Sequence, residues 1–243
     1  MKNLAIIGYG KMGRKIEELA SGFGFQVQVV VDNEDDWLTK GSLLKTCDAA
    51  VEFTFPAVAP GNLIRLSDMG IPTVCGTTGW EKERNWVEEE VKAHGSALLV
   101  SSNFSIGMNL FFSLNAFLAR LMNSHPEYKP ALSETHHIHK LDAPSGTAKT
   151  LAASMLKELP EYQGWITAGT GKDEKMIPVT SVREGEVAGI HSIVYNGPSD
   201  QIEIRHEAFN RNGLAEGALT AARWIAGRKG IFTMEDVLYS PHC

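Results

Sequence analysis

A short apolar segment followed by three closely spaced glycines constrains the fold of this chain more than any other feature. Leu4 to Ile7 are apolar, and Gly8-Tyr9-Gly10-Lys11-Met12-Gly13 follow, ahead of a helical pattern. Between a strand and a helix, Gly8 permits a tight turn, Gly10 lets a pyrophosphate approach the backbone, and Gly13 allows close helix packing. Free N–H groups at the helix start attract phosphate. The turn therefore predicts a dinucleotide site, with a purely structural turn as the alternative.

Strands and helices alternate over the first hundred residues or so. After Leu4–Ile7, four apolar segments predict buried strands at Val27–Val31, Ala49–Phe53, Pro72–Cys75 and Ala97–Val100. Helical patterns occur at Ala57–Met69 and at residues 81–93, where we expect Trp86, Val87 and Val91 to face inward. Because parallel strands need crossover connections, this order predicts a parallel α/β sheet.

The pattern of elements changes in the middle of the chain. An apolar helix is predicted at Met108–Met122, a strand at Ala131–His137 and a helix at Ser145–Leu159. Three later segments predict strands that are close in sequence and therefore antiparallel: Met176–Arg183, Glu186–Asn196 and Gln201–Ala208. Helical patterns return at Leu214–Ile225 and Thr233–Leu238. The middle of the chain is thus expected to form a second, α+β domain.

Small and hydroxyl side chains follow three of the predicted parallel strands. Thr54 follows one strand, Gly76-Thr77-Thr78 the next, and Ser102-Asn103-Phe104 a third. Ligands of such sheets bind outside the carboxyl ends of the strands, so we expect these loops to contact a nicotinamide and its ribose. Ordinary turn chemistry is the alternative for each loop taken alone.

One acidic residue bears on the kind of dinucleotide. Asp32 ends the second predicted strand, at the position where a carboxylate binds the adenosine ribose hydroxyls. Its charge repels the 2′-phosphate of NADP, and the next residue is Asn33 rather than a cation. Lys11 in the turn offsets part of that repulsion. We therefore expect NADH to be used at least as well as NADPH.

The densest group of reactive side chains lies between Glu134 and Ala148, in the order Glu-Thr-His-His-Ile-His-Lys-Leu-Asp-Ala-Pro-Ser-Gly-Thr-Ala. We assign proton transfer to His136 or Lys140, because histidine is protonated near neutral pH and lysine supplies a positive charge or a proton. Ser145 is a good N-cap, and the N–H groups of a helix start at Ser145–Thr147 bind a carboxylate. The segment therefore predicts a dianionic substrate beside a proton donor.

Two other interpretations of the histidines stay open. His136, His137 and His139 could ligate a metal, but the sequence has no distant Cys pair or His-Glu-x-x-His motif to support one. On a strand, His137 and His139 point to one face and His136 to the other. The three could also be surface histidines. Because reduction by hydride also needs a proton, the Gly-rich turn favours a reductase, and we predict no metal.

Bulk properties make several other classes of protein unexpected. The 243 residues carry a net charge of −6 with no dense basic cluster, so we expect no nucleic-acid partner. The apolar segment after Met1 is too short for a signal peptide, and no apolar segment is long enough for a membrane span. Cys47, Cys75 and Cys243 have no paired spacing, which indicates a reducing compartment. We therefore expect a cytoplasmic protein.

The segment from Glu134 to Ala148 resembles the signature of the dihydrodipicolinate reductase (4-hydroxy-tetrahydrodipicolinate reductase) family of the diaminopimelate–lysine pathway. Further motifs that look like those of the family occur in the family's order: Gly10-Lys11-Met12-Gly13, Glu52-Phe53-Thr54, Gly76-Thr77-Thr78-Gly79, Asn103-Phe104-Ser105-x-Gly107-x-Asn109, His206-Glu207-Ala208-x-x-Arg211 and Gly217-Ala218. The resemblance covers nearly the whole chain. Departures lie at the adenosine end, where the first turn is one residue shorter than the commoner Gly-x-x-Gly spacing and the segment from Asp32 to Ala49 is short.

The resemblance implies a Rossmann-type dinucleotide-binding domain at residues 1–104 and 211–243, and a substrate and oligomerisation domain at 105–210. It implies a homotetramer built through the second domain's sheet. NADH or NADPH would reduce a cyclic dicarboxylate, 4-hydroxy-tetrahydrodipicolinate, to tetrahydrodipicolinate. At matching positions the resemblance implies His136 as catalytic acid/base and Lys140 as proton donor. Substrate would be bound by His137, Gly146 and Thr147, and cofactor contacts would come from Thr77-Thr78 and Ser102 to Phe104.

Three rival functions remain at this stage. A related two-domain NAD(P) dehydrogenase acting on an amino-acid precursor, such as an aspartate or homoserine dehydrogenase, would keep the cofactor site and change the substrate. A metal-dependent hydrolase would use the histidines as ligands. A non-catalytic nucleotide sensor would leave the proton-transfer cluster without a use.

Overall fold

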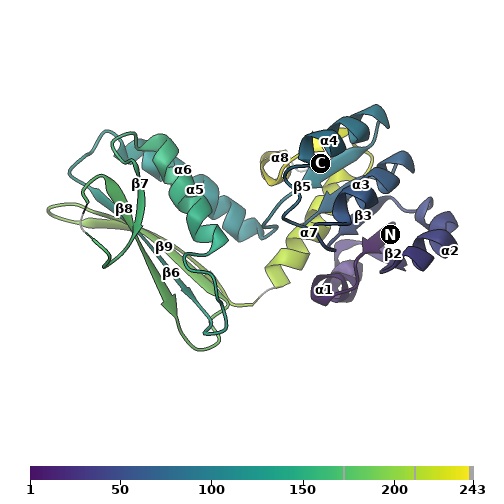
Figure 1. Cartoon of the computed structure of the whole chain (residues 1–243), viewed down its shortest axis with the longest axis horizontal. Coiled ribbons are helices and arrows are strands. Elements are labelled where there is room, and N and C mark those ends of the chain that lie inside the picture. The colour runs from purple at the N-terminus through teal and green to yellow at the C-terminus, as the bar shows by residue number, and fades with distance from the viewer. Residues whose placement is uncertain (172, 211, 241–243) are drawn as a thin grey trace. The chain divides into compact units, whose positions relative to one another are not determined.

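The computed structural model describes residues 1–171, 173–210 and 212–240, and the chain divides into two compact units (Figure 1). Unit 1 comprises Met1–Ile106 with Asn212–Cys243, and unit 2 comprises Gly107–Arg211. Arg211 of the His206 motif and Cys243 lie outside the described residues. Dinucleotide binding by residues 1–104 with 211–243 stays a prediction. So do substrate binding and oligomerisation by residues 105–210.

Unit 1 is built on a six-stranded sheet in the order β11-β5-β4-β3-β1-β2, with every pair parallel, as predicted. Its strands are β1 (Lys2–Ile7), β2 (Phe25–Val31), β3 (Ala49–Glu52), β4 (Thr73–Cys75), β5 (Ala97–Val100) and β11 (Gly230–Phe232). The strand order reverses at β1, which lies between β2 and β3. Such a reversal places the ligand crevice outside the carboxyl ends of β1 and β3.

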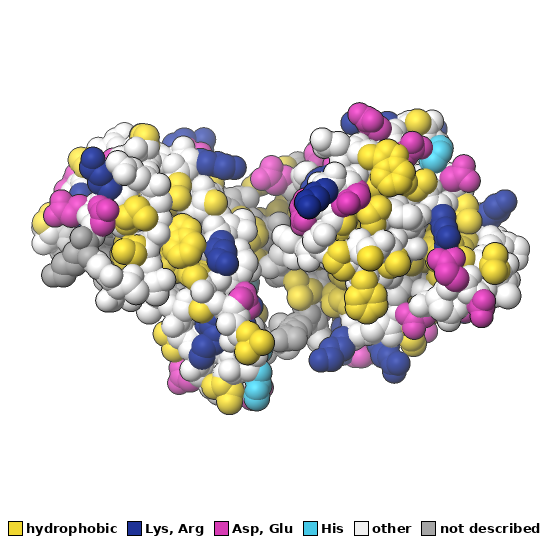
Figure 2. Space-filling model, in the orientation of Figure 1, with side chains coloured by type: hydrophobic (Ala, Val, Ile, Leu, Met, Phe, Trp, Pro, Cys, Tyr) yellow, Lys and Arg dark blue, Asp and Glu magenta, His cyan; other side chains and the backbone are white. Residues whose placement is uncertain are grey.

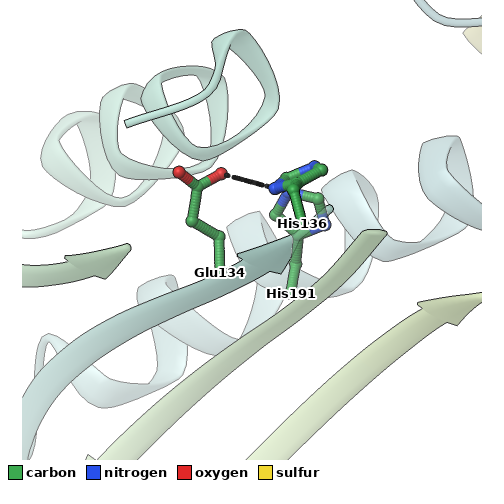
Figure 3. A group of neighbouring side chains, drawn as sticks. All are labelled: Glu134, His136 and His191. Carbon is green, nitrogen blue, oxygen red and sulfur yellow. Dashed lines mark ion pairs between the residues drawn. The ribbon is translucent and has the colours of Figure 1, made fainter. Parts of the chain in front are cut away.

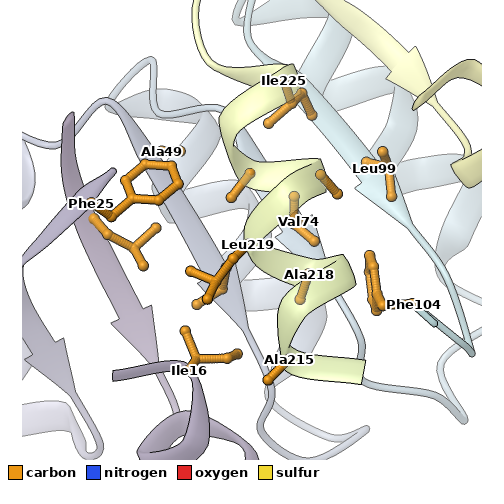
Figure 4. Packing of buried hydrophobic residues seen from close by; sticks show 14 of the residues in the cluster. Ile16, Phe25, Ala49, Val74, Leu99, Phe104, Ala215, Ala218, Leu219 and Ile225 are labelled. Atoms are coloured by element: carbon orange, nitrogen blue, oxygen red, sulfur yellow. The ribbon is translucent and has the colours of Figure 1, made fainter. Parts of the chain in front are cut away.

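Helices cover both faces of this sheet. Leu4 and Ile6 of β1 belong to one buried cluster, whereas Ala5 and Ile7 belong to another, because alternate strand residues face opposite sides. Figure 4 shows α7 packed on the first face together with α1. The helices are α1 (Lys11–Ala20), α2 (Glu34–Leu44), α3 (Ala59–Asp68), α4 (Arg84–Ala93), α7 (Asn212–Ile225) and α8 (Met234–Tyr239), with a 3₁₀ turn η1 (Ser21–Phe23).

Two details of unit 1 differ from the sequence-based expectations. Trp86 does not face inward: it is 52% exposed, while Val87 and Val91, one helical turn apart, are buried. Helix α2 is not predicted, because its apolar residues do not form one stripe. Its start is nevertheless marked, since the Asn33 side chain accepts the Asp36 N–H at 3.0 Å and acidic residues fill the first turn.

Unit 2 is a five-stranded mixed sheet in the order β10-β9-β6-β8-β7, with α5 and α6 packed on one face (Figure 1). Strand β6 is central, pairing antiparallel with β9 and parallel with β8. The elements are α5 (Ile106–Met122), β6 (Lys129–His136), α6 (Gly146–Glu158), β7 (Gly164–Thr167), β8 (Met176–Arg183), β9 (Gly189–Asn196) and β10 (Gln201–Ala208).

Two expectations for unit 2 are corrected. The prediction that β8, β9 and β10 are consecutive antiparallel neighbours holds for β9 and β10, but β6 lies between β8 and β9. The prediction took neighbours in the sequence as neighbours in the sheet, but β6, from earlier in the chain, pairs with both β8 and β9. Strand β6 also ends at His136, so the residues from 137 to 139 are not on a strand.

The surface charges and the cysteine thiols say little about the function of the chain. On the face in Figure 2, Lys and Arg side chains are interspersed with Asp and Glu. Among the described helices, none has both the length and the apolar character needed to cross a bilayer. Cys47 and Cys75 are free thiols, and burial raises the pKa of the Cys75 thiol.

Candidate active site

The Gly-rich turn joins β1 to α1 in unit 1. Gly8 has a φ of +91°, in the left-handed region that favours glycine. A Cβ on Gly13 would lie 2.2 Å from the Gly8 carbonyl oxygen, so a side chain there would push α1 off the turn. A Cβ on Gly10 would meet no protein atom within 4 Å, and Gly10 caps α1 without a side-chain hydrogen bond. Open space therefore lies beside an uncapped helix start, which suits a phosphate.

A pocket of about 650 Å³ opens at the carboxyl ends of the unit 1 strands, and its lining includes most of the predicted cofactor residues. These are Gly8, Tyr9, Gly10, Lys11, Met12, Asp32, Thr54, Gly76, Thr77 and Thr78. Ser102 lines a second pocket of about 320 Å³, which shares Thr77 and Thr78 with the first. The tertiary structure thus brings loops from four strand ends together, and the residues present fit a dinucleotide.

Asp32 lies where the second strand ends, and its carboxylate is held against the turn. Its Oδ1 accepts the Tyr9 N–H at 2.7 Å, and its own N–H donates to Asp36 Oδ2 at 2.8 Å. Glu34, Asp35 and Asp36 follow in the first turn of α2. Negative charge therefore gathers at the end of the pocket where the adenosine ribose is expected.

Glu52, the last residue of β3, organises the strand-end loops and was not singled out as a site residue from the sequence. It is fully buried and accepts hydrogen bonds from the hydroxyls of Thr54 and Thr77, the latter at 2.7 Å. The Thr54 N–H donates to the Thr77 hydroxyl at 2.8 Å. Glu52 therefore holds two pocket-lining threonines together. In the sequence, Glu52 could have been recognised as an acidic residue inside an otherwise apolar predicted strand.

Phe104, the last residue of the predicted cofactor loop, belongs to the core of unit 1. Phe104 is 2% exposed in the core, with its ring centroid 5.8 Å from that of Phe53. Its carbonyl oxygen would lie 1.8 Å from a Cβ on Gly217. Asn103 Oδ1 accepts the Ser105 N–H at 3.0 Å. Because the Phe104 side chain is buried in packing, we leave it out of the proposed cofactor contacts.

In unit 2, three buried side chains from two strands meet beside the helices. Glu134 and His136 are two residues apart on β6 and therefore point to the same face, and His191 comes from β9 (Figure 3). Glu134 Oε2 lies 3.3 Å from His136 Nδ1 and 3.9 Å from His191 Nε2. Burial, with His136 nearby, lowers the pKa of His191 to about 4, so that His191 is neutral at pH 7.

The other oxygen of Glu134 connects this cluster to its surroundings. Oε1 accepts the Ser145 N–H and the Ser181 hydroxyl, both at 2.9 Å, and lies 3.3 Å from Arg183 Nη2. Burial opposes the charged carboxylate, but hydrogen bonds from His136, Ser145 and Ser181 outweigh it and hold the pKa of Glu134 well below its usual range. Glu134 is therefore a buried anion with several partners.

Lys140 lies in the loop after β6, close in the chain to these groups. Its Nζ lies 2.7 Å from Asp142 Oδ1. The backbone of this loop is held by Arg183, whose Nε donates to the Lys140 carbonyl at 3.3 Å and whose Nη2 donates to the Asp142 carbonyl. The His137 N–H donates to the Val187 carbonyl at 2.8 Å. His139 forms an exposed pair with Glu186 at 3.1 Å, and we assign it no chemical role.

The start of α6 behaves as an N-cap, with one correction to the expected anion cradle. The Ser145 hydroxyl accepts the Ala148 N–H at 3.1 Å, as predicted for a capping residue. Ser145 itself is buried and its N–H is donated to Glu134, so that N–H is already occupied. The first two helical residues, Gly146 and Thr147, have N–H groups without intrahelical partners. The cradle is therefore restricted to these two residues.

The grouping of Glu134, His136 and His191 also changes the metal alternative. One ligand atom from each lies within 4.8 Å of the others, a spacing that could accommodate a cation. His137 and His139 are not part of this group. His191, which was not predicted as a site residue, lies directly opposite Glu134 in the pairing of β6 with β9. No local sequence pattern indicates that pairing.

Comparison with known proteins places both units in one family. Residues 2–104 match the family model for the dihydrodipicolinate reductase N-terminus, and residues 107–238 match the model for its C-terminus. A 4-hydroxy-tetrahydrodipicolinate reductase from Christiangramia forsetii is 39% identical over 236 residues, which cover 97% of each chain. One from Methanopyrus kandleri is 36% identical over 203 residues, covering 82% of this chain and 74% of the relative.

Solved structures share the fold. A dipicolinate-bound dihydrodipicolinate reductase from Paenisporosarcina sp. TG-14 has a TM-score of 0.77 and 22% identity, covering 96% of this chain and 97% of that one. A probable dehydrogenase from Thermotoga maritima, at 11% identity, has a TM-score of 0.55 and covers 97% of this chain and 92% of that one. Together with the matched family models and the curated relatives, these findings show that the chain belongs to the dihydrodipicolinate reductase family.

Proposed function

We propose that this chain reduces 4-hydroxy-tetrahydrodipicolinate to tetrahydrodipicolinate in the diaminopimelate pathway of lysine biosynthesis, with a nicotinamide cofactor bound in the unit 1 pocket. The curated relatives carry the name of that activity. The observation that carries the proposal is the pairing of buried His136 with Glu134, next to the open N-terminus of α6. This arrangement offers a proton donor and an anion cradle to one substrate.

The cofactor side of the proposal assigns a part of the dinucleotide to each loop. The Gly8–Gly13 turn and the start of α1 would hold the pyrophosphate, and Asp32 would accept from the adenosine ribose hydroxyls. Thr54, Gly76, Thr77, Thr78, Ser102 and Asn103 would surround the nicotinamide end. When bound, the cofactor supplies the hydride.

The substrate side assigns binding and proton transfer to unit 2. A carboxylate of the substrate would accept the N–H groups of Gly146 and Thr147 and the Thr147 hydroxyl, with His137 and Lys140 as further partners. His136, held at Nδ1 by Glu134, would donate a proton from Nε2, or Lys140 would donate it from Nζ. Ser145 contributes by capping α6 and so fixing the cradle.

The function is tested by following NADH oxidation with freshly generated dihydrodipicolinate, and with the substrates of aspartate and homoserine dehydrogenases as comparisons. We expect turnover with the cyclic dicarboxylate alone. Because the proposed proton donor needs no metal, activity should persist after dialysis against a chelator. Stoichiometric zinc whose removal abolishes turnover would favour the metal-dependent alternative built on Glu134, His136 and His191.

NADH should be used at least as well as NADPH. Asp32 is fixed beside the turn, and acids at the start of α2 add negative charge where a 2′-phosphate would lie. Two of the nearby cations are already paired, Lys40 with Asp36 at 2.7 Å and Arg65 with Glu34 at 2.8 Å. The measurement is kcat/KM for both cofactors at saturating substrate. A preference for NADPH greater than about tenfold, or about 1.4 kcal/mol, would contradict the expectation.

We also propose a homotetramer built through the sheet of unit 2, and a cytoplasmic location. The family resemblance supports this assembly, and the sheet leaves the apolar side chains of Val182 and Ile202 partly exposed, at 39% and 38%. The molar mass in solution tests the assembly, and a monomer at micromolar concentration would rule it out.

A further inference from the structure

We propose that the buried Glu134–Arg183 ion pair is the positioning element that holds both proposed proton donors, His136 and Lys140, in working geometry. Glu134 acts on the imidazole and Arg183 acts on the loop that carries the lysine. This inference rests on the function proposed above and adds two residues to it.

Glu134 faces one edge of the His136 ring and so acts on its orientation. The Oε2 atom lies 3.3 Å from His136 Nδ1, so this edge of the ring faces the carboxylate. The proton available to a ligand is then the one on Nε2. Gly189 leaves room on that side, since a Cβ there would lie 3.3 Å from His136 Nε2. The carboxylate therefore occupies the Nδ1 edge of the ring, and the Nε2 edge is the one left for a ligand.

Arg183 extends the same arrangement to Lys140. Its Nη2 lies 3.3 Å from Glu134 Oε1 and also donates to the Asp142 carbonyl, while its Nε donates to the Lys140 carbonyl. The planar guanidinium can make these bonds together, which a lysine could not. Because carbonyls on both sides of Leu141 are held, the backbone of Lys140 is fixed relative to the carboxylate that orients His136.

The titratable and charged groups around His136 come from several elements. Glu134 is on β6, as is His136 itself, and Arg183 on β8 is the register partner of His136. His191 is on β9, and Lys140 is in the loop after β6. His206 on β10 is the register partner of His191. His191 and His206 have pKa values lowered by burial, so both are neutral at pH 7. Glu134 is therefore the anion in direct contact with the imidazole.

The decisive variant is Glu134→Gln, which keeps the shape of the side chain and removes its charge. We expect kcat to fall at least about 100-fold, the scale of a lost general acid. KM for NADH should stay within about twofold, because the cofactor pocket lies in unit 1, so the loss falls on kcat and not on cofactor binding. Glu134→Asp should restore part of kcat, because it returns the carboxylate on a shorter side chain.

Arg183→Lys tests the second half of the proposal. It keeps the positive charge but lacks the fork that reaches two carbonyls and a carboxylate. We expect kcat/KM for the dicarboxylate to fall about tenfold or more, with KM for NADH unchanged within about twofold, because the cofactor pocket lies in unit 1. Wild-type kinetics in this variant would remove Arg183 from the proposal, even if Glu134→Gln does not fold.

Matched controls separate positioning from general effects. Glu186→Gln makes the same change in an exposed Glu–His pair, that of Glu186 with His139, and Arg205→Lys alters an exposed arginine paired with Glu207. Both should behave like the wild type. If Glu134→Gln lowers only the melting temperature and leaves kcat unchanged, the role is structural and the inference fails. A wild-type protein without reductase activity would instead refute the proposed function.

Discussion

Lys140→Ala is expected to lower both kcat and the apparent affinity for the dicarboxylate, reducing kcat/KM about 1000-fold, or about 4 kcal/mol. The lysine is part of a held loop, with its Nζ 2.7 Å from Asp142 Oδ1 and its carbonyl bound by Arg183. In the proposed complex its charge stabilises a substrate carboxylate before and during proton transfer. The alanine variant loses that charge in both states, so kcat and KM should both change.

Steady-state kinetics at saturating NADH, with the dicarboxylate varied, measure this effect. Lys149→Ala, at an exposed lysine on α6, is the matched control and should leave both constants unchanged within about twofold. Lys140→Arg separates the two roles of the lysine. Arginine keeps the charge but does not release a proton at neutral pH, so it should restore KM without restoring kcat if Lys140 is the donor. Near-normal kinetics in Lys140→Ala would remove the residue from the site.

Gly13→Ala and Gly10→Ala are expected to damage unit 1 in different ways. A methyl on Gly13 would lie 2.2 Å from the Gly8 carbonyl oxygen, a backbone atom that cannot move without opening the turn. We expect the free energy of unfolding to fall by about 2 to 3 kcal/mol and NADH binding to be lost. A methyl on Gly10 meets no protein atom within 4 Å, so stability should change by less than about 1 kcal/mol.

Gly10→Ala should nevertheless raise the Kd for NADH by at least about tenfold, because the methyl would lie where the pyrophosphate must approach the backbone. Fluorescence titration with NADH and urea unfolding measure the two effects separately. Gly61→Ala, at an exposed glycine inside α3 with no atom within 4 Å of its Cβ, is the control that should change neither Kd nor fold. Normal NADH binding by Gly10→Ala would mean that the turn is structural only.

Much of the fold follows from local patterns in the sequence. The apolar segments of unit 1 became parallel strands because each is buried on both faces, and the glycines after β1 took the turn that their spacing predicts. Ser145 caps α6 because its hydroxyl reaches the N–H three residues on, which is a purely local interaction. The very short strand β11 and helix α2 escaped prediction, since one lacks length and the other lacks an apolar stripe.

The candidate site was predicted only in part, because some of its residues act through partners that are distant in the sequence. His136 and Lys140 carry reactive groups that can be recognised one residue at a time. Glu52, Arg183 and His191 matter through their partners, and those partners are far away in the chain. Thr77 lies 25 residues from Glu52, and Ser181 lies 47 residues from Glu134. Phe104 is the reverse case, a residue of the cofactor motif whose side chain proved to be buried in the core.

The sequence by itself determined the strand–turn–helix that should bind phosphates, the alternation that builds a parallel sheet, and the proton donors with a capped helix beside them. These features depend on interactions between residues within about four positions of each other. Backbone geometry and side-chain type are then enough to predict them. Only the tertiary structure decided that β6 lies between β8 and β9, which sets Glu134 opposite both Ser181 and His191. The physical reason is register: a strand pairing fixes which distant residues meet, and a shift by one residue would turn Glu134 to the other face of the sheet.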